Sequence, residues 1–324
     1  MRRLNDERGA TAVTVAVAAA VLIAIAGLAI DAGALYQERR ELGNGADAAA
    51  LAVAEDCGLR ARPCDAATAL ATASSYASAN ARDGTADVVD VLVSSAGRSV
   101  SVVTATRNPD GTTQMEPFFA RVVGVEGTTV QASATAIWGY PYSLPAVLPL
   151  IISECEFPGA ENLPSPPEVI YFHDGNNAEP CNAHAGQDAD GDGILAGGFG
   201  WLSTPSGCEV ALALGMWSPA DPGSSPTTGC SDEDVRGLLG REIPIPYFDD
   251  LDETGANGRY HVAGFGMFHV TGYNFGGQFK APDAQSAPCR GDERCIGGYF
   301  TRGTVFEGEI GGPDHGVVIV KLVD

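Results

Sequence analysis

Residues 10–30 read ATAVTVAVAAAVLIAIAGLAI, and this stretch decides how the rest of the chain is organised. No charged residue lies between Arg8 and Asp31. A helix over these residues rises about 32 Å, which matches the roughly 30 Å hydrocarbon core of a bilayer. Nine of the residues are Val, Leu or Ile, and together they contribute about −3 to −5 kcal/mol of insertion free energy. The sequence therefore predicts a transmembrane helix at residues 10–30.

Basic residues flank this span, with more before it than after it: Arg2, Arg3, Arg8, Arg39 and Arg40. The positive-inside rule then places residues 1–9 in the cytoplasm and the long C-terminal part outside the cell membrane. A cleaved signal peptide is the alternative, because the N-terminal arginines and the small-residue triplet at 24–26 both fit one. We favour a permanent single-pass anchor, since the apolar run is longer than a usual signal core and a helical pattern continues beyond it.

The composition restricts the partners of the chain. It has 324 residues, of which 45% are apolar, and 41 Asp plus Glu against 19 Lys plus Arg give a net charge of −22. An acidic surface repels nucleic acid and anionic headgroups, so nucleic-acid binding is disfavoured. Cations or a basic partner are the natural complements.

Eight cysteines are spread along the chain and none forms a CxxC pair: Cys57, Cys64, Cys155, Cys181, Cys208, Cys230, Cys289 and Cys295. They lie among Gly, Pro and Asp, which favours disulfides in an exported domain over buried thiols in a cytosolic protein. Four bonds among eight cysteines allow 105 connectivities. Loop length alone suggests pairing between neighbours, namely 57–64, 155–181, 208–230 and 289–295.

We expect an α+β fold with two parts beyond the membrane. In residues 31–138 the helix continues to about Asp56, and a small module follows with a helix at 65–81, strands at 88–93, 99–106 and 128–138, and a short helix at 118–123. The proline-bearing stretch 139–149 predicts a linker. Short apolar runs between Gly, Pro and Asp then predict an irregular, mostly β, disulfide-containing exported domain over residues 150–324.

An apolar stripe runs along the helix beyond the span, because Leu35, Leu42 and Ala49 recur every seven residues. Such a narrow stripe suits packing against another helix. Packing against the protein's own sheet explains it equally well, so both interpretations stay open.

Several segments together resemble one family. They are Arg8-Gly9-Ala10, the apolar span, Leu28-Ala29-Ile30-Asp31-Ala32-Gly33, Arg39-Arg40-Glu41-Leu42, and Ala46-Asp47-Ala48-Ala49-Ala50-Leu51-Ala52. They look like the N-terminal signature of TadE/TadG-like proteins, which are membrane-anchored proteins of the bacterial tight-adherence (Flp) pilus assembly system. Residues 118–124 and 130–136 are also similar to TadG-like chains, so the resemblance covers about residues 8–138.

The resemblance implies a non-enzymatic membrane protein of pilus assembly and secretion, which packs laterally through its helix and meets pilins or other assembly proteins outside the membrane. Two features of the wider family are missing. Thr14 stands where pilins cleaved after a glycine such as Gly9 carry a glutamate, and no DxSxS motif of a von Willebrand factor A-type metal site occurs.

One acidic loop has the spacing of a calcium ligand set. Asp188, Asp190 and Asp192 would take positions one, three and five of an EF-hand-like loop, with Gly193 at six and the Ile194 carbonyl at seven. Position twelve is Phe199 instead of a bidentate glutamate. Calcium is thus a candidate ligand and no other cofactor is expected, while a solvated acidic turn is the alternative. A calcium-dependent, envelope-anchored adhesion or binding module is the second functional hypothesis.

An exported hydrolase is the third hypothesis, and the sequence gives it little support. The five histidines form no HExxH motif, and no GxSxG motif occurs. We therefore predict no enzymatic activity and no catalytic residues.

Overall fold

The computed structural model describes residues 8–323 apart from 109, 173–180, 183–193, 196, 253–257 and 282–287. The described chain forms two compact units. The first lies within Met1–Asp56, Arg62–Ile137 and Leu322–Asp324, and the second comprises Cys57–Ala61 and Trp138–Lys321. The fold class is α+β, as predicted, with a long N-terminal helix followed by a mostly β region.

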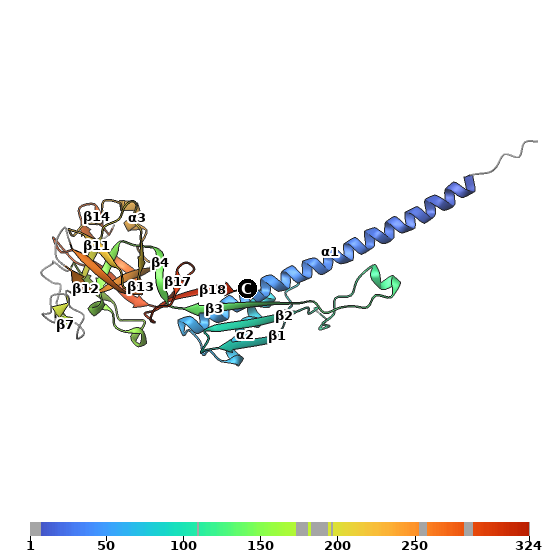
Figure 1. The fold of residues 1–324 in the computed structure, drawn as a ribbon, viewed down its shortest axis with the longest axis horizontal. Helices are drawn as coiled ribbons and strands as arrows, with labels where there is room; N and C mark the ends of the chain where they lie inside the picture. The colour runs from blue at the N-terminus through green and yellow to red at the C-terminus, as the bar shows by residue number, and fades with distance from the viewer. Residues whose placement is uncertain are drawn as a thin grey trace, which may run out of the picture. The chain divides into compact units, whose positions relative to one another are not determined.

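The first unit is built on one long helix that extends far beyond its strands (Figure 1). Its elements are α1 (Arg8–Leu59), α2 (Ala66–Asn80), β1 (Asp87–Ser94), β2 (Ser99–Ala105), the 3₁₀ turn η1 (Ala120–Val123) and β3 (Gln131–Gly139). Strand β2 pairs antiparallel with both β1 and β3. Asp65 begins α2 by accepting a hydrogen bond from the Thr68 backbone N–H, as N-cap residues do. Each predicted helix and strand of this module is confirmed to within a few residues.

The second unit is mostly strands, joined by short turns. Its elements are β4 (Pro141–Val147), β5 (Leu150–Ser153), η2 (Glu154–Glu156), η3 (Ala160–Asn162), β6 (Glu168–Tyr171), β7 (Cys181–Asn182), β8 (Ile194–Leu195), β9 (Phe199–Leu202), β10 (Val210–Ala213), β11 (Trp217–Asp221), α3 (Asp232–Arg236), β12 (Glu242–Asp252), β13 (Arg259–Gly276), β14 (Phe279–Lys280), β15 (Cys295–Thr301), β16 (Gly303–Val305), β17 (Glu309–Ile310) and β18 (Val317–Val323).

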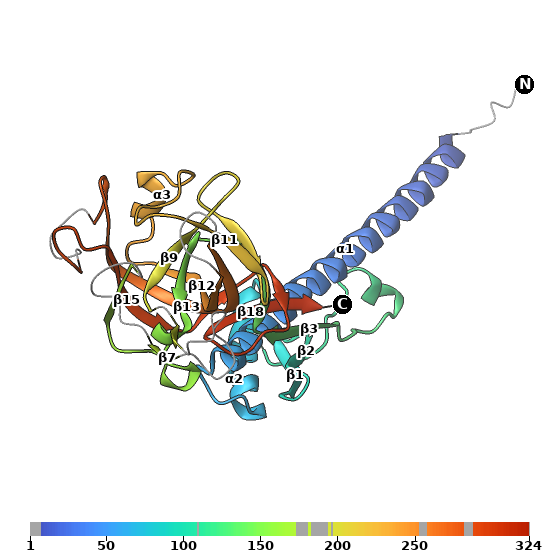
Figure 2. The same ribbon diagram turned by 60° about the vertical axis from the view of Figure 1, so that its left-hand side comes forward.

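A large sheet organises this unit, with the strand order β11-β9-β5-β12-β13-β15-β6 and β14 paired to β13. Its strands β9, β11, β12, β13 and β15 are labelled in Figure 2. Its spine is the antiparallel pair of β12 and β13, the two longest strands described. Strand β5 joins β12 in parallel. A smaller sheet has the order β10-β4-β17, and β16 pairs in parallel with β18.

Both faces of the large sheet are covered by apolar side chains. Successive side chains of a strand point to opposite faces, so Leu150 and Ile152 join one buried cluster while Ile151 joins the other. The first cluster is aromatic, with Trp201 and Phe268 fully buried. A strand buried on both sides requires a continuous apolar run, which explains the unbroken sequence Leu150-Ile151-Ile152.

The stretch 139–149, which we expected to be a linker, instead contains the central strand of the smaller sheet. Leu144 and Val147 of β4 are buried. A β-bulge accommodates the proline, because Leu144 pairs with Leu212 and Val147 with Val210, so that Pro145 and one neighbour face a single residue of β10. Proline content alone therefore misled the linker prediction.

Two predicted disulfides are present in the second unit, Cys208–Cys230 and Cys289–Cys295. Cys57, Cys64 and Cys155 are disulfide-bonded as well. Among the described cysteines there is no free thiol. The side chain of Cys181 lies outside the described residues, so the pairing predicted for it, and that of 57 with 64, stay predictions.

Candidate membrane anchor and candidate sites

The first half of α1 leaves its large apolar side chains uncovered. Leu22 and Ile23 are 66% and 67% exposed, and the other Val, Leu and Ile residues of the predicted span are exposed to a similar extent. Of the described helices, α1 alone is long and apolar enough to cross a membrane. Exposed aliphatic residues on all sides are expected of a helix whose solvent is lipid, not water.

The second half of α1 is buried within its own unit. Leu42, Ala46, Ala49 and Val53 have almost no exposed surface. The Thr104 hydroxyl of β2 donates a 2.9 Å hydrogen bond to the Leu42 carbonyl. Of the two interpretations of the apolar stripe, packing against the protein's own sheet is therefore correct for the part from Leu42 onward.

Glycine allows α2 to approach α1 closely at one point. A Cβ atom added at Gly45 would lie 3.3 Å from the Ala77 carbonyl oxygen of α2. Because the facing positions on α2 are also small, including buried Ala73 and Ala77, the two helices pack backbone to backbone. This contact explains a glycine that, by propensity alone, only weakens the helix.

Asp31, the first charged residue after the span, holds a distant turn. Its carboxylate accepts hydrogen bonds from three successive backbone N–H groups: Phe118 at 2.9 Å, Phe119 at 3.0 Å and Ala120 at 2.6 Å. The aspartate is 7% exposed. Three N–H donors to one carboxylate favour its ionised form and compensate the cost of its burial. The structure thus joins two segments that the sequence singled out separately.

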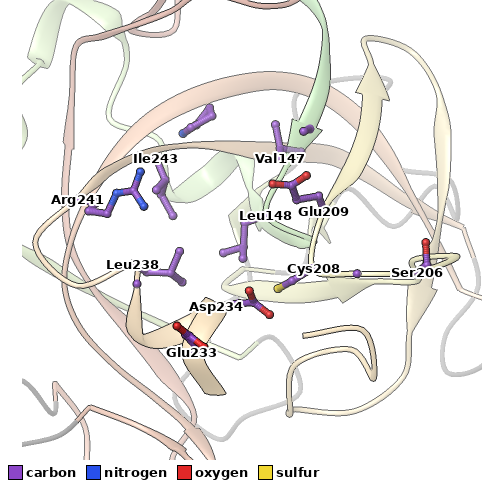
Figure 3. Close-up of a pocket in the computed structure, with 14 residues that line it drawn as sticks. Val147, Leu148, Ser206, Cys208, Glu209, Glu233, Asp234, Leu238, Arg241 and Ile243 are labelled. Atoms are coloured by element: carbon purple, nitrogen blue, oxygen red, sulfur yellow. The ribbon is translucent and has the colours of Figure 1, made fainter. Parts of the chain in front are cut away.

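A pocket of about 510 Å³ opens on the second unit (Figure 3). Its lining combines aliphatic residues with charged ones: Ala146, Val147, Leu148, Ser206, Gly207, Cys208, Glu209, Glu233, Asp234, Gly237, Leu238, Arg241, Ile243 and Pro244. Leu148 and Leu238 belong to its apolar part, and Arg241 lies across from Glu209 (Figure 3).

Two polar groups of this lining, those of Asp234 and Cys208, already have structural roles. Asp234 is occupied as a capping residue of α3, because it accepts hydrogen bonds from the Ser231 hydroxyl at 2.7 Å and backbone N–H at 2.8 Å. The Ser231 hydroxyl, followed by its backbone N–H, lowers the pKa of Asp234. Cys208 is held in a disulfide, and no histidine lies among the lining residues.

The predicted calcium ligands cannot be placed. Asp188, Asp190 and Asp192 lie outside the described residues, and of Ile194 only the backbone, in β8, is described. Among the residues that are described, no group of three or more His, Cys, Asp or Glu side chains could hold a metal ion. The calcium site therefore stays a prediction.

The described histidines have structural partners. His261 Nδ1 lies 2.6 Å from Asp249 Oδ1, and its ring packs beside Trp217. His269 stacks on Tyr299 at a centroid distance of 4.8 Å. His315 is enclosed by Phe157 and Tyr247, and burial lowers its pKa to about 4.

Two carboxyl groups are half-buried near each other in the second unit. Burial, followed by the charge of Glu156, raises the pKa of Glu168 to about 7, against an opposing hydrogen bond from the Ser165 hydroxyl. Burial also raises the pKa of Glu156, which accepts a 2.6 Å hydrogen bond from the Gly198 N–H. Sequence reasoning missed both residues, because a glutamate between prolines and a short strand carries no signal of burial.

Residues 9–56 match a family model described as putative Flp pilus-assembly TadE/G-like. The match confirms the resemblance for the N-terminal helix. Residues 57–138, where the resemblance was also noted, lie outside the match. No curated protein and no solved structure matches the chain. The matched segment contains the exposed apolar half of α1, Asp31 and the buried alanine-rich half.

Proposed function

We propose, from the premise that residues 9–56 are a TadE/TadG-like segment, that this chain is a non-enzymatic, membrane-anchored component of a tight-adherence pilus assembly system. One observation carries the proposal: the matched segment is a helix whose first half exposes aliphatic residues over the length of a bilayer. Residues 1–9 are then cytoplasmic, 10–30 span the membrane, and the rest is extracytoplasmic.

The charges and the disulfides support this orientation. Three arginines precede the span and two follow it, which favours a cytoplasmic N-terminus. Disulfides such as Cys208–Cys230 persist in oxidising compartments, so they favour an extracytoplasmic second unit.

Labelling of single added cysteines tests this orientation. We expect Phe306→Cys, at an exposed position, to react with an impermeant maleimide in spheroplasts, and Asn5→Cys to react only after lysis. The reverse labelling pattern would show that the N-terminus is extracytoplasmic and the second unit cytoplasmic, which contradicts the proposed orientation.

Lateral contacts with other membrane proteins would use the exposed half of α1. The buried half is covered by β2 and α2 and offers little surface to a partner. A photo-crosslinking amino acid at Leu22 in the native bacterium should capture another membrane protein, and the same group at buried Leu42 should not. Deletion of the gene should abolish pili; normal pili would remove the assembly role.

Calcium binding by residues 188–194 stays a separate proposal that rests on the sequence alone. Calorimetric titration of the full chain with Ca²⁺ should give a heat that Asp190→Asn abolishes. Absence of heat from the unaltered chain would leave the loop as a solvated turn.

A further inference from the structure

The turn at residues 118–125 carries apolar side chains that its unit leaves uncovered. Phe118 is 79% exposed and Val122 is 86% exposed, and Phe119 and Val125 are exposed to a lesser degree. The 3₁₀ turn η1 is four residues long, too short to form a core of its own. Single exposed apolar residues are common, but several within one turn mark a contact surface.

The same turn is fixed to α1 by two contacts. Asp31 accepts the backbone N–H groups of residues 118–120, as described above. The Phe119 ring lies directly against Gly27, since a Cβ atom added at Gly27 would be 2.7 Å from Phe119 Cγ. In both views the turn lies alongside α1, away from the end of the helix that packs on the strands (Figures 1 and 2).

These contacts fix the level of the turn along the α1 axis relative to the predicted span. Gly27 lies three residues before the end of the predicted span, which corresponds to about 5 Å along the helix axis. Phe119 therefore meets α1 at a level inside the apolar span, while Asp31 lies just beyond its end. Apolar faces of interfacial segments reach about 5–10 Å into the headgroup and acyl boundary, and the level of Gly27, about 5 Å inside the predicted span, falls in this range.

We propose that the turn 118–125 is a second membrane contact, in which Phe118, Val122 and Val125 insert into the outer leaflet beside α1. The proposal rests on the membrane anchoring proposed above. Lipid is the favoured partner of these exposed side chains because the turn is continuous with the predicted span. Phe119 contacts α1 at the level of Gly27, where acyl chains would surround the helix, so the same acyl chains can cover the turn.

The charges of the turn indicate what kind of lipid surface is needed. Arg121 pairs with Glu116 at 2.6 Å, so the turn offers no free cation to anionic headgroups through this arginine. The chain as a whole carries a net charge of −22. The contact is thus hydrophobic, and a zwitterionic bilayer suffices for it. With membrane contacts at both the span and the turn, α1 would be held in one rotational orientation about its axis in the bilayer.

Depth-dependent fluorescence quenching tests the proposal on the full chain in phosphatidylcholine vesicles that contain brominated acyl chains. Tryptophan is placed at Phe118, at Ile30 within the span, and at Leu92 on the exposed face of β1, and each variant is compared with the parent chain to subtract its three tryptophans. We expect Phe118→Trp and Ile30→Trp to be quenched at least twofold and Leu92→Trp not to be quenched. Quenching of Ile30→Trp without Phe118→Trp overturns this inference alone, whereas loss of both overturns the membrane anchor as well.

Two further variants test how the turn is held. Added to Phe118→Trp, Asp31→Asn should lower the quenching at least twofold, and so should Gly27→Leu, which displaces the Phe119 ring. Gly33→Leu is the matched control, because a Cβ atom at Gly33 meets no other atom within 4 Å. Undiminished quenching in both test variants would contradict the fixed depth. A photo-crosslinker at Val122 that joins two copies of the chain would make a second copy the occupant, and would overturn the lipid proposal.

Discussion

The two units use their apolar residues in opposite ways. In the first unit, α1 exposes Val, Leu and Ile over the predicted span, whereas in the second unit the large aromatic side chains, including Trp201 and Phe268, are fully buried. Burial of such side chains stabilises a water-soluble fold by roughly 1.5–3 kcal/mol each. The second unit therefore has a large aromatic interior of its own, while the predicted span of the first unit leaves its aliphatic side chains exposed. Different perturbations should therefore disrupt the two units.

The same contrast exists within α1 itself. The exposed half carries nine Val, Leu and Ile residues beside its alanines, whereas the buried side chains of the second half are mostly small, such as those of Ala46 and Ala49. Small side chains let α2 and the strands approach the helix, but they give lipid little apolar area per residue. The content of Val, Leu and Ile thus distinguishes the exposed half from the buried half of one continuous helix.

Charges within the span should have the largest effect. Leu22→Lys combined with Ile23→Lys costs about 5–7 kcal/mol at the centre of a bilayer, more than the insertion free energy of the span. We expect the variant to be released by alkaline carbonate, whereas the parent chain stays in the membrane pellet. Tyr36→Lys with Gln37→Lys is the control, since both residues lie beyond the span. Retention of the Leu22 and Ile23 variant in the pellet would show that the helix does not span.

Loss of a disulfide should affect the second unit and leave membrane anchoring intact. Cys208 and Cys230 are separated by 22 residues, so replacing both by alanine should lower the free energy of unfolding by about 3 kcal/mol. For Cys289 and Cys295, separated by 6, the shorter loop predicts about 2 kcal/mol. Denaturant unfolding in detergent measures both, and carbonate extraction should be unchanged. An unextractable parent and an extractable cysteine variant would argue that the units are not independent.

One substitution placed in both halves of α1 sharpens the comparison further. Ala46→Leu adds volume where the side chain is fully buried and should destabilise the first unit by about 1–3 kcal/mol. Ala20→Leu makes the same change at an exposed position of the span and should leave thermal stability unchanged or slightly raised. Equal effects of the two substitutions would mean that the span is also covered by protein.

The features that sequence could predict are those written in consecutive residues. The span, the continuation of α1, and the strands of the first unit follow from hydrophobicity and periodicity. The neighbouring cysteine pairs 208–230 and 289–295 follow from loop length alone.

What the sequence could not give depends on contacts between distant residues. Asp31 and residues 118–120 are separated by almost ninety positions, and the sequence of neither segment indicates that the two are in contact. Strand β4 contains prolines, and only its pairing with β10 and β17 in the folded chain shows that this stretch is a strand. The depth of burial around Glu168 likewise arises only when β6 joins the edge of the large sheet.

Replacement of Glu168 should give the smallest effect, and one confined to the second unit. The pKa of Glu168 is raised from 4.5 to about 7 in the folded chain, so between these values the unfolded state loses its proton while the folded state keeps it. Stability therefore falls as pH rises from 4.5 to 7, and Glu168→Gln should remove that loss, gaining about 1–2 kcal/mol at pH 8 after allowance for partial exposure.

Buried His315, whose pKa is lowered from 6.5 to about 4, acts oppositely, because its contribution to the free energy of unfolding is lost as pH falls from 6.5 to 4. Since His315 is present in both proteins, the difference between parent and Glu168→Gln isolates the glutamate. Denaturant unfolding at pH 4.5 and pH 8, with exposed Glu161→Gln as the control, should show a gain only at the higher pH; an equal gain at both would mean that the glutamate is destabilising for a reason other than its charge.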